Sequence, residues 1–334
     1  MINSHTTYLT CMGVIDVLNL PRKDILLILV RNYKNTLMRG YEFIDASEIC
    51  LKSEQVFDKK FDRSCVRAMV EEVDRFICRN IEGTFHLYAP HLSHPFWQIV
   101  YTSKSCFSFS YVQEGCLPFK NAYVNKAPFL AKLKNIYMAY VSKGRVWCYR
   151  PWFLREKIID INKIDSYSID DNFFKYLPVR NTLVKWPTPS DMPTVSFKSN
   201  HKIFIFDAFV KNHIMESVDY LLQCELLIDK EASDYNYLKF HPGQTPQEKM
   251  QILMIFEKRN LKYIILDNNI PFEYIIMTQK NLALTGYGSS LLFLAYSYLH
   301  KVTCYDDELL KYPLYQRYKR CSGFMSFKEY TGKK

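Results

Sequence analysis

The chain has 334 residues, of which 48% are hydrophobic and 23% are charged. This balance is typical of a globular protein and excludes intrinsic disorder. There are 10 glycines against 23 phenylalanines and 25 tyrosines, which excludes collagen-like and low-complexity classes. Because one domain takes about 150 residues, we expect two compact domains. The net charge of +10 indicates an anionic partner.

Ten cysteines are scattered along the chain, and no two of them have the Cys-x-x-Cys spacing of zinc sites. The N-terminal residues do not resemble a signal peptide. The apolar run at residues 25–30 is much shorter than the about 20 residues of a membrane span. We therefore expect reduced cysteines, no zinc site and a cytoplasmic location.

In the first half of the chain, short apolar runs alternate with amphipathic stretches, which is typical of α/β proteins. Residues 24–30 are almost continuously apolar, as expected of a parallel strand buried on both faces. Residues 64–79 have apolar side chains at helical spacing. The predicted strands are residues 7–10, 24–30, 85–88, 98–101 and 108–112, and the predicted helices are residues 12–20 and 64–79.

The middle of the chain, residues 127–190, has weaker periodicity, and the proline-containing stretch at residues 186–193 predicts a linker. A second α/β alternation follows. Its predicted strands are residues 202–206, 237–240, 262–266 and 282–285, and its predicted helices are residues 213–224, 245–259, 272–277 and 289–298. We expect an N-terminal domain over residues 1–190, a C-terminal domain over residues 191–310 and a tail over residues 311–334.

The tail at residues 311–334 contains seven basic residues and one acidic residue, which alternate with aromatic residues. Rings and cations together suit the headgroup level of an anionic membrane. The same mixture could bind single-stranded nucleic acid. A solvated tail packed loosely on the body is the third interpretation. Of the two binding interpretations we favour the membrane, and we expect no nucleic-acid partner.

Glu114 follows the predicted strand 108–112 and precedes Gly115. A carboxylate at the carboxyl end of a parallel strand lies at the open edge of a sheet. There it would be ionised at neutral pH and able to accept a proton from a hydroxyl. On this segment alone, an ordinary loop glutamate is the simpler interpretation.

His241 follows the predicted strand 237–240, and Pro242 restricts the backbone beside it. An imidazole at this edge can donate a hydrogen bond to a phosphate and titrates near neutrality. The dipeptide also occurs at His94-Pro95, so that His-Pro alone does not identify a site.

Residues 285–290, Thr-Gly-Tyr-Gly-Ser-Ser, form a glycine turn between a predicted strand and a predicted helix. Ser289 and Ser290 stand at the helix start, where backbone N–H groups and the helix dipole suit a phosphate. A simple serine N-cap gives the same pattern. The turn lacks the third glycine of a dinucleotide fingerprint and the Gly-Lys-Ser/Thr ending of a Walker loop. Residues 269–273, Asn-Ile-Pro-Phe-Glu, precede it.

The order of these four segments resembles that of the bacterial sialyltransferases of GT-B architecture. These include the lipooligosaccharide, polysialic acid and multifunctional marine-type enzymes. The resemblance is strongest in residues 239–291, where three motifs match in order and approximate spacing: His241-Pro242, Pro271-Phe272-Glu273 and Ser289-Ser290. In the N-terminal half it rests on Gln113-Glu114-Gly115 and on the predicted strand that opens at residues 8–11.

The resemblance implies two Rossmann-like α/β domains facing a central cleft, a cytidine monophosphate (CMP) sialic acid donor, and no metal or other cofactor. Glu114 is then the general base that deprotonates the acceptor hydroxyl, and His241 binds the phosphate and assists departure of the nucleotide. Glu273 accepts hydrogen bonds from the ribose hydroxyls. Ser289 and Ser290 hold the phosphate. The remaining residues implied in CMP binding are Pro242, Gly243 and Gly288.

We therefore expect an inverting, metal-independent transfer of sialic acid to a hydroxyl of a bacterial surface glycan, lipooligosaccharide or capsule. The enzyme would lie peripherally on the cytoplasmic face of the inner membrane, and its acceptor could be lipid-linked. One alternative is a transferase that uses another CMP-activated sugar such as Kdo. The other is a non-catalytic basic module that binds anionic lipid or nucleic acid. By polarity and position, the candidates for acceptor contact are His91, His94, Trp97 and Lys104.

Overall fold

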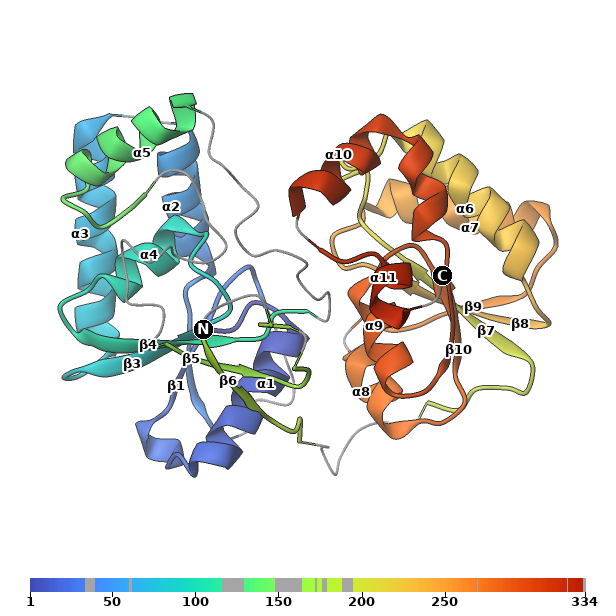
Figure 1. Ribbon diagram of the computed structural model, residues 1–334, viewed down its shortest axis with the longest axis horizontal. Coiled ribbons are helices and arrows are strands. Elements are labelled where there is room, and N and C mark those ends of the chain that lie inside the picture. Colours follow the sequence, from blue (N-terminus) through green and yellow to red (C-terminus); the bar gives the residue numbers. More distant parts are fainter. Residues whose placement is uncertain are drawn as a thin grey trace. The chain divides into compact units, whose positions relative to one another are not determined.

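The structure is a computed structural model that describes residues 1–33, 40–59, 62–115, 129–147, 164–171, 173–175, 179–187, 195–268, 270–322 and 324–332. The chain divides into two compact units (Figure 1). Unit 1 comprises residues 1–114 and 121–187, and unit 2 comprises residues 115–120 and 188–334. The boundary was expected after residue 190. From residue 188 onward, the predicted linker 186–193 lies outside the described residues.

Unit 1 contains a four-stranded sheet in the order β3-β4-β5-β6 and a separate pair, β1-β2, and every pairing is parallel. Its strands are β1 (Leu26–Leu29), β2 (Glu42–Asp45), β3 (Phe85–Ala89), β4 (Cys106–Val112), β5 (Asp165–Ser168) and β6 (Arg180–Leu183). Its helices are α1 (His5–Leu18), η1 (Arg22–Asp24), α2 (Ser47–Lys59), α3 (Arg63–Asn80), α4 (Pro95–Tyr101) and α5 (Phe129–Val141). Parallel β1 and helical α3 confirm those two predictions.

The start of the chain is helical, so that the predicted strand 7–10, and with it the strand opening at residues 8–11, is wrong. These residues lie in α1, which Ser4 caps by accepting a hydrogen bond from the N–H of Thr7 at 3.2 Å. Within the helix, the Thr10 hydroxyl donates to the Thr6 carbonyl at 2.9 Å. The threonines favour a strand by local propensity, but the cap and the burial of α1 outweigh that preference.

The predicted strand 98–101 is also wrong, because these residues form the last part of α4. Pro95 occupies the first turn of this helix, and His94 is its N-cap. Ile99 and Val100 are buried, and a segment this short has no period that distinguishes a strand from a buried helix.

Unit 2 contains a five-stranded parallel sheet in the order β11-β10-β7-β8-β9. Its strands are β7 (His201–Phe206), β8 (Tyr235–Phe240), β9 (Tyr263–Ile265), β10 (Ala283–Gly286) and β11 (Lys301–Cys304). Its helices are α6 (Ser217–Glu231), α7 (Pro246–Lys258), α8 (Phe272–Thr278), α9 (Ser290–Ser297), η3 (Asp306–Lys311), α10 (Pro313–Ser322) and α11 (Phe327–Thr331). The two parallel-sheet units confirm the predicted α/β class.

The strand order of unit 2 is that of a doubly wound, Rossmann-like sheet. The chain begins in the middle with β7, runs outward through β8 and β9, and then returns to the other side of β7 as β10 and β11 (Figure 1). The switch point therefore lies between β7 and β10. In such sheets, ligands bind outside the carboxyl ends of the strands at the switch point.

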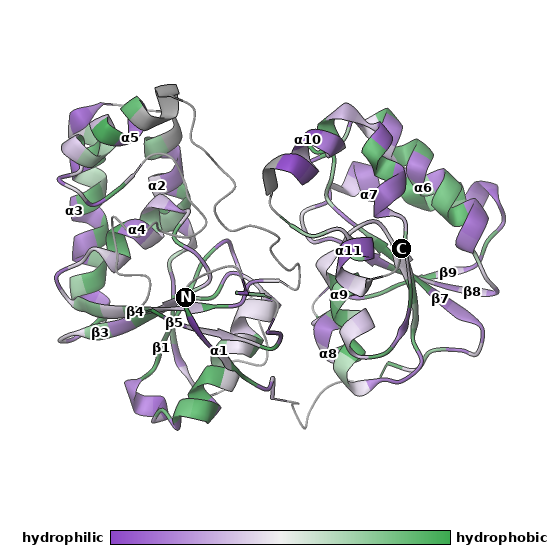
Figure 2. Ribbon diagram, in the orientation of Figure 1, coloured by the Kyte–Doolittle hydropathy of each residue, from purple (hydrophilic) through white to green (hydrophobic). Residues whose placement is uncertain are grey.

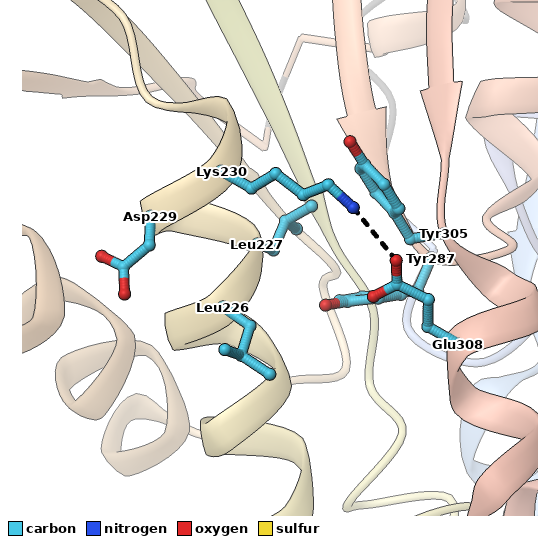
Figure 3. A pocket seen from close by; sticks show the side chains of 7 residues that line it. All are labelled: Leu226, Leu227, Asp229, Lys230, Tyr287, Tyr305 and Glu308. Carbon is cyan, nitrogen blue, oxygen red and sulfur yellow. Dashed lines mark hydrogen bonds and ion pairs between the residues drawn. The ribbon is translucent and has the colours of Figure 1, made fainter.

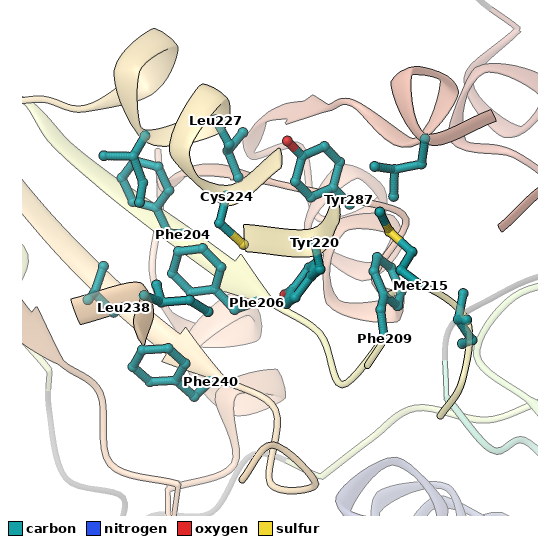
Figure 4. Close-up of a cluster of buried hydrophobic side chains, with 14 of the residues drawn as sticks. Phe204, Phe206, Phe209, Met215, Tyr220, Cys224, Leu227, Leu238, Phe240 and Tyr287 are labelled. Atoms are coloured by element: carbon teal, nitrogen blue, oxygen red, sulfur yellow. The ribbon is translucent and has the colours of Figure 1, made fainter. Parts of the chain in front are cut away.

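An aromatic core holds β7, one of the two strands that border the switch point, against β8 (Figure 4). Phe206 of β7 stacks on Phe204 with ring centroids 6.0 Å apart and on Phe240 of β8 at 5.4 Å. From α6, Tyr220 and Cys224 pack against the same cluster. Hydrophobic and hydrophilic residues alternate along α6 and α7 (Figure 2), which is the pattern of helices with one buried face.

The end of the chain is folded onto unit 2. Phe327 of α11 packs edge-on against Phe293 of α9, with ring centroids 5.2 Å apart. The buried Asp306 carboxylate accepts a hydrogen bond from the Phe327 N–H at 3.2 Å and pairs with Lys319 of α10 at 3.5 Å. The interpretation of residues 311–334 as a loosely packed tail is therefore wrong for α10 and α11. In the described residues, we find no helix that is both long and apolar enough to span a membrane.

Gly286 sets how closely β10 can approach β7. A Cβ at this position would lie 2.6 Å from the Ile205 carbonyl oxygen, so that only glycine fits the observed pairing. We predict that Gly286→Ala lowers the free energy of unfolding by about 1–3 kcal/mol, because the extra carbon overpacks the sheet. Urea unfolding of both proteins measures the difference. An unchanged free energy of unfolding would contradict the close approach.

Candidate active site

Glu114 lies just beyond the carboxyl end of β4, as predicted. The segment before it is tied to β5 and the loop that follows. The Gln113 N–H donates to the Tyr167 carbonyl at 2.9 Å, and the Gln113 side-chain oxygen accepts from the Ile169 N–H at 2.9 Å. These bonds fix the backbone that carries the carboxylate. The Glu114 side chain is 19% exposed, so that it can still be reached from solvent.

Three donors surround the Glu114 carboxylate. His91 Nε2 lies 2.9 Å from Oε2, Arg31 Nη1 lies 3.7 Å from Oε1, and the Asn3 amide donates to Oε1. Burial acts to raise the pKa of Glu114, but the contacts with His91, Arg31 and Asn3 outweigh it and hold the pKa below its ordinary value. The group is therefore a carboxylate at neutral pH.

His91 lies in the loop between β3 and α4, where it is buried. Its Nδ1 accepts hydrogen bonds from the Ser93 N–H at 3.2 Å and from the Ser93 hydroxyl at 2.6 Å, so that the ring proton lies on Nε2 and faces Glu114. Burial lowers the pKa of His91, and the ring packs on Trp97 with centroids 4.3 Å apart. Sequence reasoning named His91 for its polarity but did not pair it with Glu114. His94 instead lies 3.4 Å from Glu54.

His241 lies at the carboxyl end of β8 in unit 2. Its N–H donates to the Phe206 carbonyl and to the Gln244 side-chain oxygen, both at 2.9 Å, and its Nδ1 accepts from the Gly243 N–H at 2.9 Å. The Pro242-Gly243 turn therefore holds the ring. Because Nδ1 is an acceptor here, the proton of the neutral ring lies on Nε2 and is available to a ligand.

Lysines surround His241. His241 is exposed, but the surrounding protein still removes part of the water around its ring, which lowers the pKa of His241. The charges of Lys211, Lys239 and Lys249 lower this pKa further. Lys239 is buried at the end of β8, and its Nζ donates to Asn268 at 2.7 Å. This concentration of positive charge suits an anionic ligand. Sequence reasoning missed the lysines, because two of them belong to separate loops and helices.

The glycine turn follows β10. Gly288 has a φ of +50°, and a Cβ there would lie 3.1 Å from the Tyr315 hydroxyl and 3.3 Å from Asp306 Cβ. Ser289 is the N-cap residue of α9, but its side chain makes no capping hydrogen bond. The Ser289 hydroxyl thus forms no hydrogen bond with the backbone N–H groups of the helix start, in contrast to a simple serine N-cap. Ser290 is the first residue of the helix.

Tyr287 anchors this turn to α6, since its hydroxyl donates to the Gln223 carbonyl at 2.6 Å. On its other side, Tyr287 borders a pocket of about 340 Å³ between α6 and η3 (Figure 3). Lys230 in this pocket pairs with Glu308 at 3.1 Å and lies over the Tyr305 ring at 4.1 Å. Lys230 and Glu308 are thus paired with each other, and Asp229 pairs with Arg259, the C-cap residue of α7. We therefore do not assign the pocket to the active site.

Two further acidic residues lie at the same edge of the unit 2 sheet. Glu273 lies in the first turn of α8, and its charge interacts with that of Lys239. Asp207 directly follows β7 and was missed, although an aspartate after a buried strand is a recognisable signal. Glu114 belongs to unit 1, whereas His241, Glu273, Ser289 and Ser290 belong to unit 2. Among the described residues, no three His, Cys, Asp or Glu side chains form a group that could hold a metal ion.

Residues 83–306 match the family model named alpha-2,8-polysialyltransferase, and this segment includes all the residues implied in catalysis and CMP binding. The chain is therefore a glycosyltransferase that transfers sialic acid. It belongs to the alpha-2,8-polysialyltransferase family, which confirms the predicted resemblance to bacterial sialyltransferases.

A solved structure that is similar to the chain is the crystal structure of an alpha/beta-galactoside alpha-2,3-sialyltransferase from the luminous marine bacterium Photobacterium phosphoreum. It is 16% identical, with a TM-score of 0.48, and the match covers 96% of this chain and 94% of that one. No curated protein sequence matches the chain.

We predict that His91→Leu raises the pKa of Glu114, because burial remains while one of the contacts that favour the carboxylate is lost. The carboxylate of the variant should therefore begin to be lost at a higher pH as the solution is acidified. A carboxyl-carbon NMR titration measures it.

The matched control is His86→Leu. His86 lies on β3 and hydrogen bonds to Ser110 at 2.9 Å, and burial lowers its pKa as it does that of His91. This variant should leave the titration of Glu114 unchanged. Equal titration curves for the His91 variant and the unmodified protein would show that the 2.9 Å contact has no electrostatic effect.

Proposed function

We propose that the protein transfers sialic acid, with inversion, from CMP-sialic acid to a hydroxyl of a bacterial surface glycan, lipooligosaccharide or capsule. We propose further that it does so without a metal ion. The observation that carries this proposal is the set of groups at the carboxyl edge of the unit 2 sheet. An imidazole, a serine hydroxyl that does not cap α9 and several lysines there suit a nucleotide phosphate at a Rossmann switch point.

In this mechanism, the residues of unit 2 stabilise the departing CMP. The Ser289 and Ser290 hydroxyls and the N-terminus of α9 donate hydrogen bonds to the phosphate. His241 donates a hydrogen bond from its Nε2–H to the phosphate as negative charge develops on the leaving group. Glu273 accepts hydrogen bonds from the ribose hydroxyls. Preorganised neutral donors and nearby lysines can thus supply what a divalent cation would otherwise provide.

Glu114 of unit 1 acts as the general base. Its lowered pKa keeps it ionised, and His91, Arg31 and Asn3 fix its orientation. It removes the proton of the acceptor hydroxyl as that oxygen attacks the anomeric carbon. In a direct displacement, the attack occurs on the face opposite to the departing phosphate, and the configuration inverts.

The decisive experiment combines CMP titration calorimetry with turnover of CMP-sialic acid. Glu114→Gln should lower turnover by about 10²- to 10⁴-fold, because general base catalysis is lost, and should leave CMP affinity unchanged. His241→Ala and Ser289→Ala should weaken both. Ser297→Ala, near the other end of α9, is the control and should change neither. Undiminished turnover in Glu114→Gln would rule out the assigned base.

The runner-up donor is another CMP-activated sugar such as Kdo, since the same phosphate site could serve that leaving group. Hydrolysis of CMP-sialic acid and CMP-Kdo, measured side by side without acceptor, separates the two. Membership in the family favours sialic acid. It also leaves no support for a purely non-catalytic basic module.

We also propose that the enzyme works on the cytoplasmic face of the inner membrane, and that exposed basic residues of the chain end contact anionic lipid. Arg317 and Arg320 of α10 and Lys328 of α11 are exposed, whereas the aromatic residues Tyr315 and Phe327 are buried. Binding would therefore be mainly electrostatic.

Arg317→Gln with Arg320→Gln should lower binding to phosphatidylglycerol vesicles about 30-fold, because each basic residue near an anionic surface contributes about 1 kcal/mol. Vesicle co-sedimentation measures it, and the exposed Lys258 of α7, changed to Gln, serves as the control. Binding that survives the double change would exclude this face of α10.

A further inference from the structure

Asp207 is an acidic residue in the middle of a site that is otherwise built for an anion. It directly follows β7, the strand between β10 and β8, and therefore lies at the switch point of the unit 2 sheet. Its N–H donates to the Tyr220 hydroxyl at 3.1 Å. Its Oδ2 is buried and has no hydrogen-bond partner among the residues that the structure describes. A buried polar atom of this kind calls for an explanation.

The groups that face Asp207 come from three elements. Tyr220 extends from α6, Tyr315 and Tyr318 extend from α10, and Ser289 lies at the start of α9. No cation among the described residues offsets the charge of the Asp207 carboxylate. Burial raises the pKa of Asp207 to about 7, although a hydrogen bond with the Ser289 side chain acts in the opposite direction. The neutral acid is thus substantially populated at neutral pH.

We propose that Asp207 is a positioning residue for the donor phosphate, and that as a neutral acid it orients the Ser289 hydroxyl toward that phosphate. This inference rests on the proposed function. An ionised Asp207 accepts a hydrogen bond from the Ser289 hydroxyl, so that this hydroxyl cannot donate to a phosphate, and the negative charge also repels the phosphate. A neutral Asp207 carries no charge and can donate a hydrogen bond to the Ser289 oxygen. The serine hydrogen is then free to reach the ligand.

The arrangement links CMP binding to a proton. Binding of the phosphate favours neutral Asp207, so that the complex takes up a proton when the free protein holds an ionised carboxylate. The protein binds CMP with its full affinity at a pH below the pKa of Asp207. This affinity is lost as the pH rises through that pKa. With a pKa of about 7, about one molecule in ten is competent at pH 8. CMP affinity should therefore fall about tenfold between pH 6 and pH 8 because of this residue.

The experiment is a calorimetric titration with CMP at pH 6 and pH 8 on the unmodified full-length protein, Asp207→Asn and Ser289→Ala. Asparagine is nearly isosteric with the neutral acid, donates a hydrogen bond and does not titrate. We expect similar affinities for the unmodified protein and Asp207→Asn at pH 6, and about tenfold tighter binding by Asp207→Asn at pH 8. Comparison of proteins at one pH cancels the titration of CMP itself and of His241. Equal pH dependence in both proteins would overturn the proposal.

Two further outcomes separate the alternatives. In a protein that already carries Ser289→Ala, adding Asp207→Asn should give at most half of the gain in CMP affinity at pH 8 that it gives in the unmodified protein, because the hydroxyl through which it acts is absent. A full gain in affinity would overturn the positioning role. If Asp207→Asn does not fold, the comparison of the unmodified protein with Ser289→Ala decides, since the pH dependence must shrink in the variant.

Failure of the proposed donor would look different from failure of this inference. In that case, the unmodified protein would not bind CMP at either pH. The same titrations are then made with inorganic phosphate as the probe, because only the phosphate contacts Ser289. Tighter phosphate binding by Asp207→Asn than by the unmodified protein at pH 8, but not at pH 6, supports the role of Asp207. Equal binding at both pH values overturns it.

Discussion

The parallel pairing of β7 with β10 is the constraint on which the proposed donor site depends. It brings the end of β7, with Asp207, next to the turn after β10, with Ser289. It requires a glycine at position 286, because no side chain fits against the Ile205 carbonyl. On the other side of β7, the backbone of His241 bonds to the Phe206 carbonyl. Residues that lie far apart in the sequence therefore meet at one edge of one sheet.

The two units shift the pKa values of their acidic residues Glu114 and Asp207 in opposite directions. In unit 1, three donors keep one carboxylate ionised, so that it can accept a proton. In unit 2, burial favours the neutral form of another carboxyl group, while lysines gather around an imidazole nearby. Environments that move the pKa values of two acids in opposite directions are what separates a base from a neutral hydrogen-bonding group. Residue type alone would assign Glu114 and Asp207 the same chemistry.

The sequence predicted the second half better than the first, for physical reasons. All four strands predicted in residues 202–285 exist, because each is flanked by clear helix and turn signals, and three of them are largely buried whereas β9 is mostly exposed. In the first half, short runs were ambiguous, and helices begin after the Ser4 cap and at Pro95 where two strands were predicted. The motif residues could be located from order and spacing. The neighbours His91, Lys211 and Asp207 were not connected with these motifs, since their contacts exist only in the folded units.

The end of the chain borders the proposed donor site. The Tyr315 hydroxyl limits the space at Gly288, and Tyr318 interacts electrostatically with Asp207. A chain shortened before α10 to remove its basic, aromatic end would therefore lose more than a surface. The glycine turn would lose one of its walls, and Asp207 would lose two neighbouring tyrosines. Protein engineers who design expression variants or fusions of this enzyme should accordingly treat α10 as part of unit 2 rather than as a dispensable appendage.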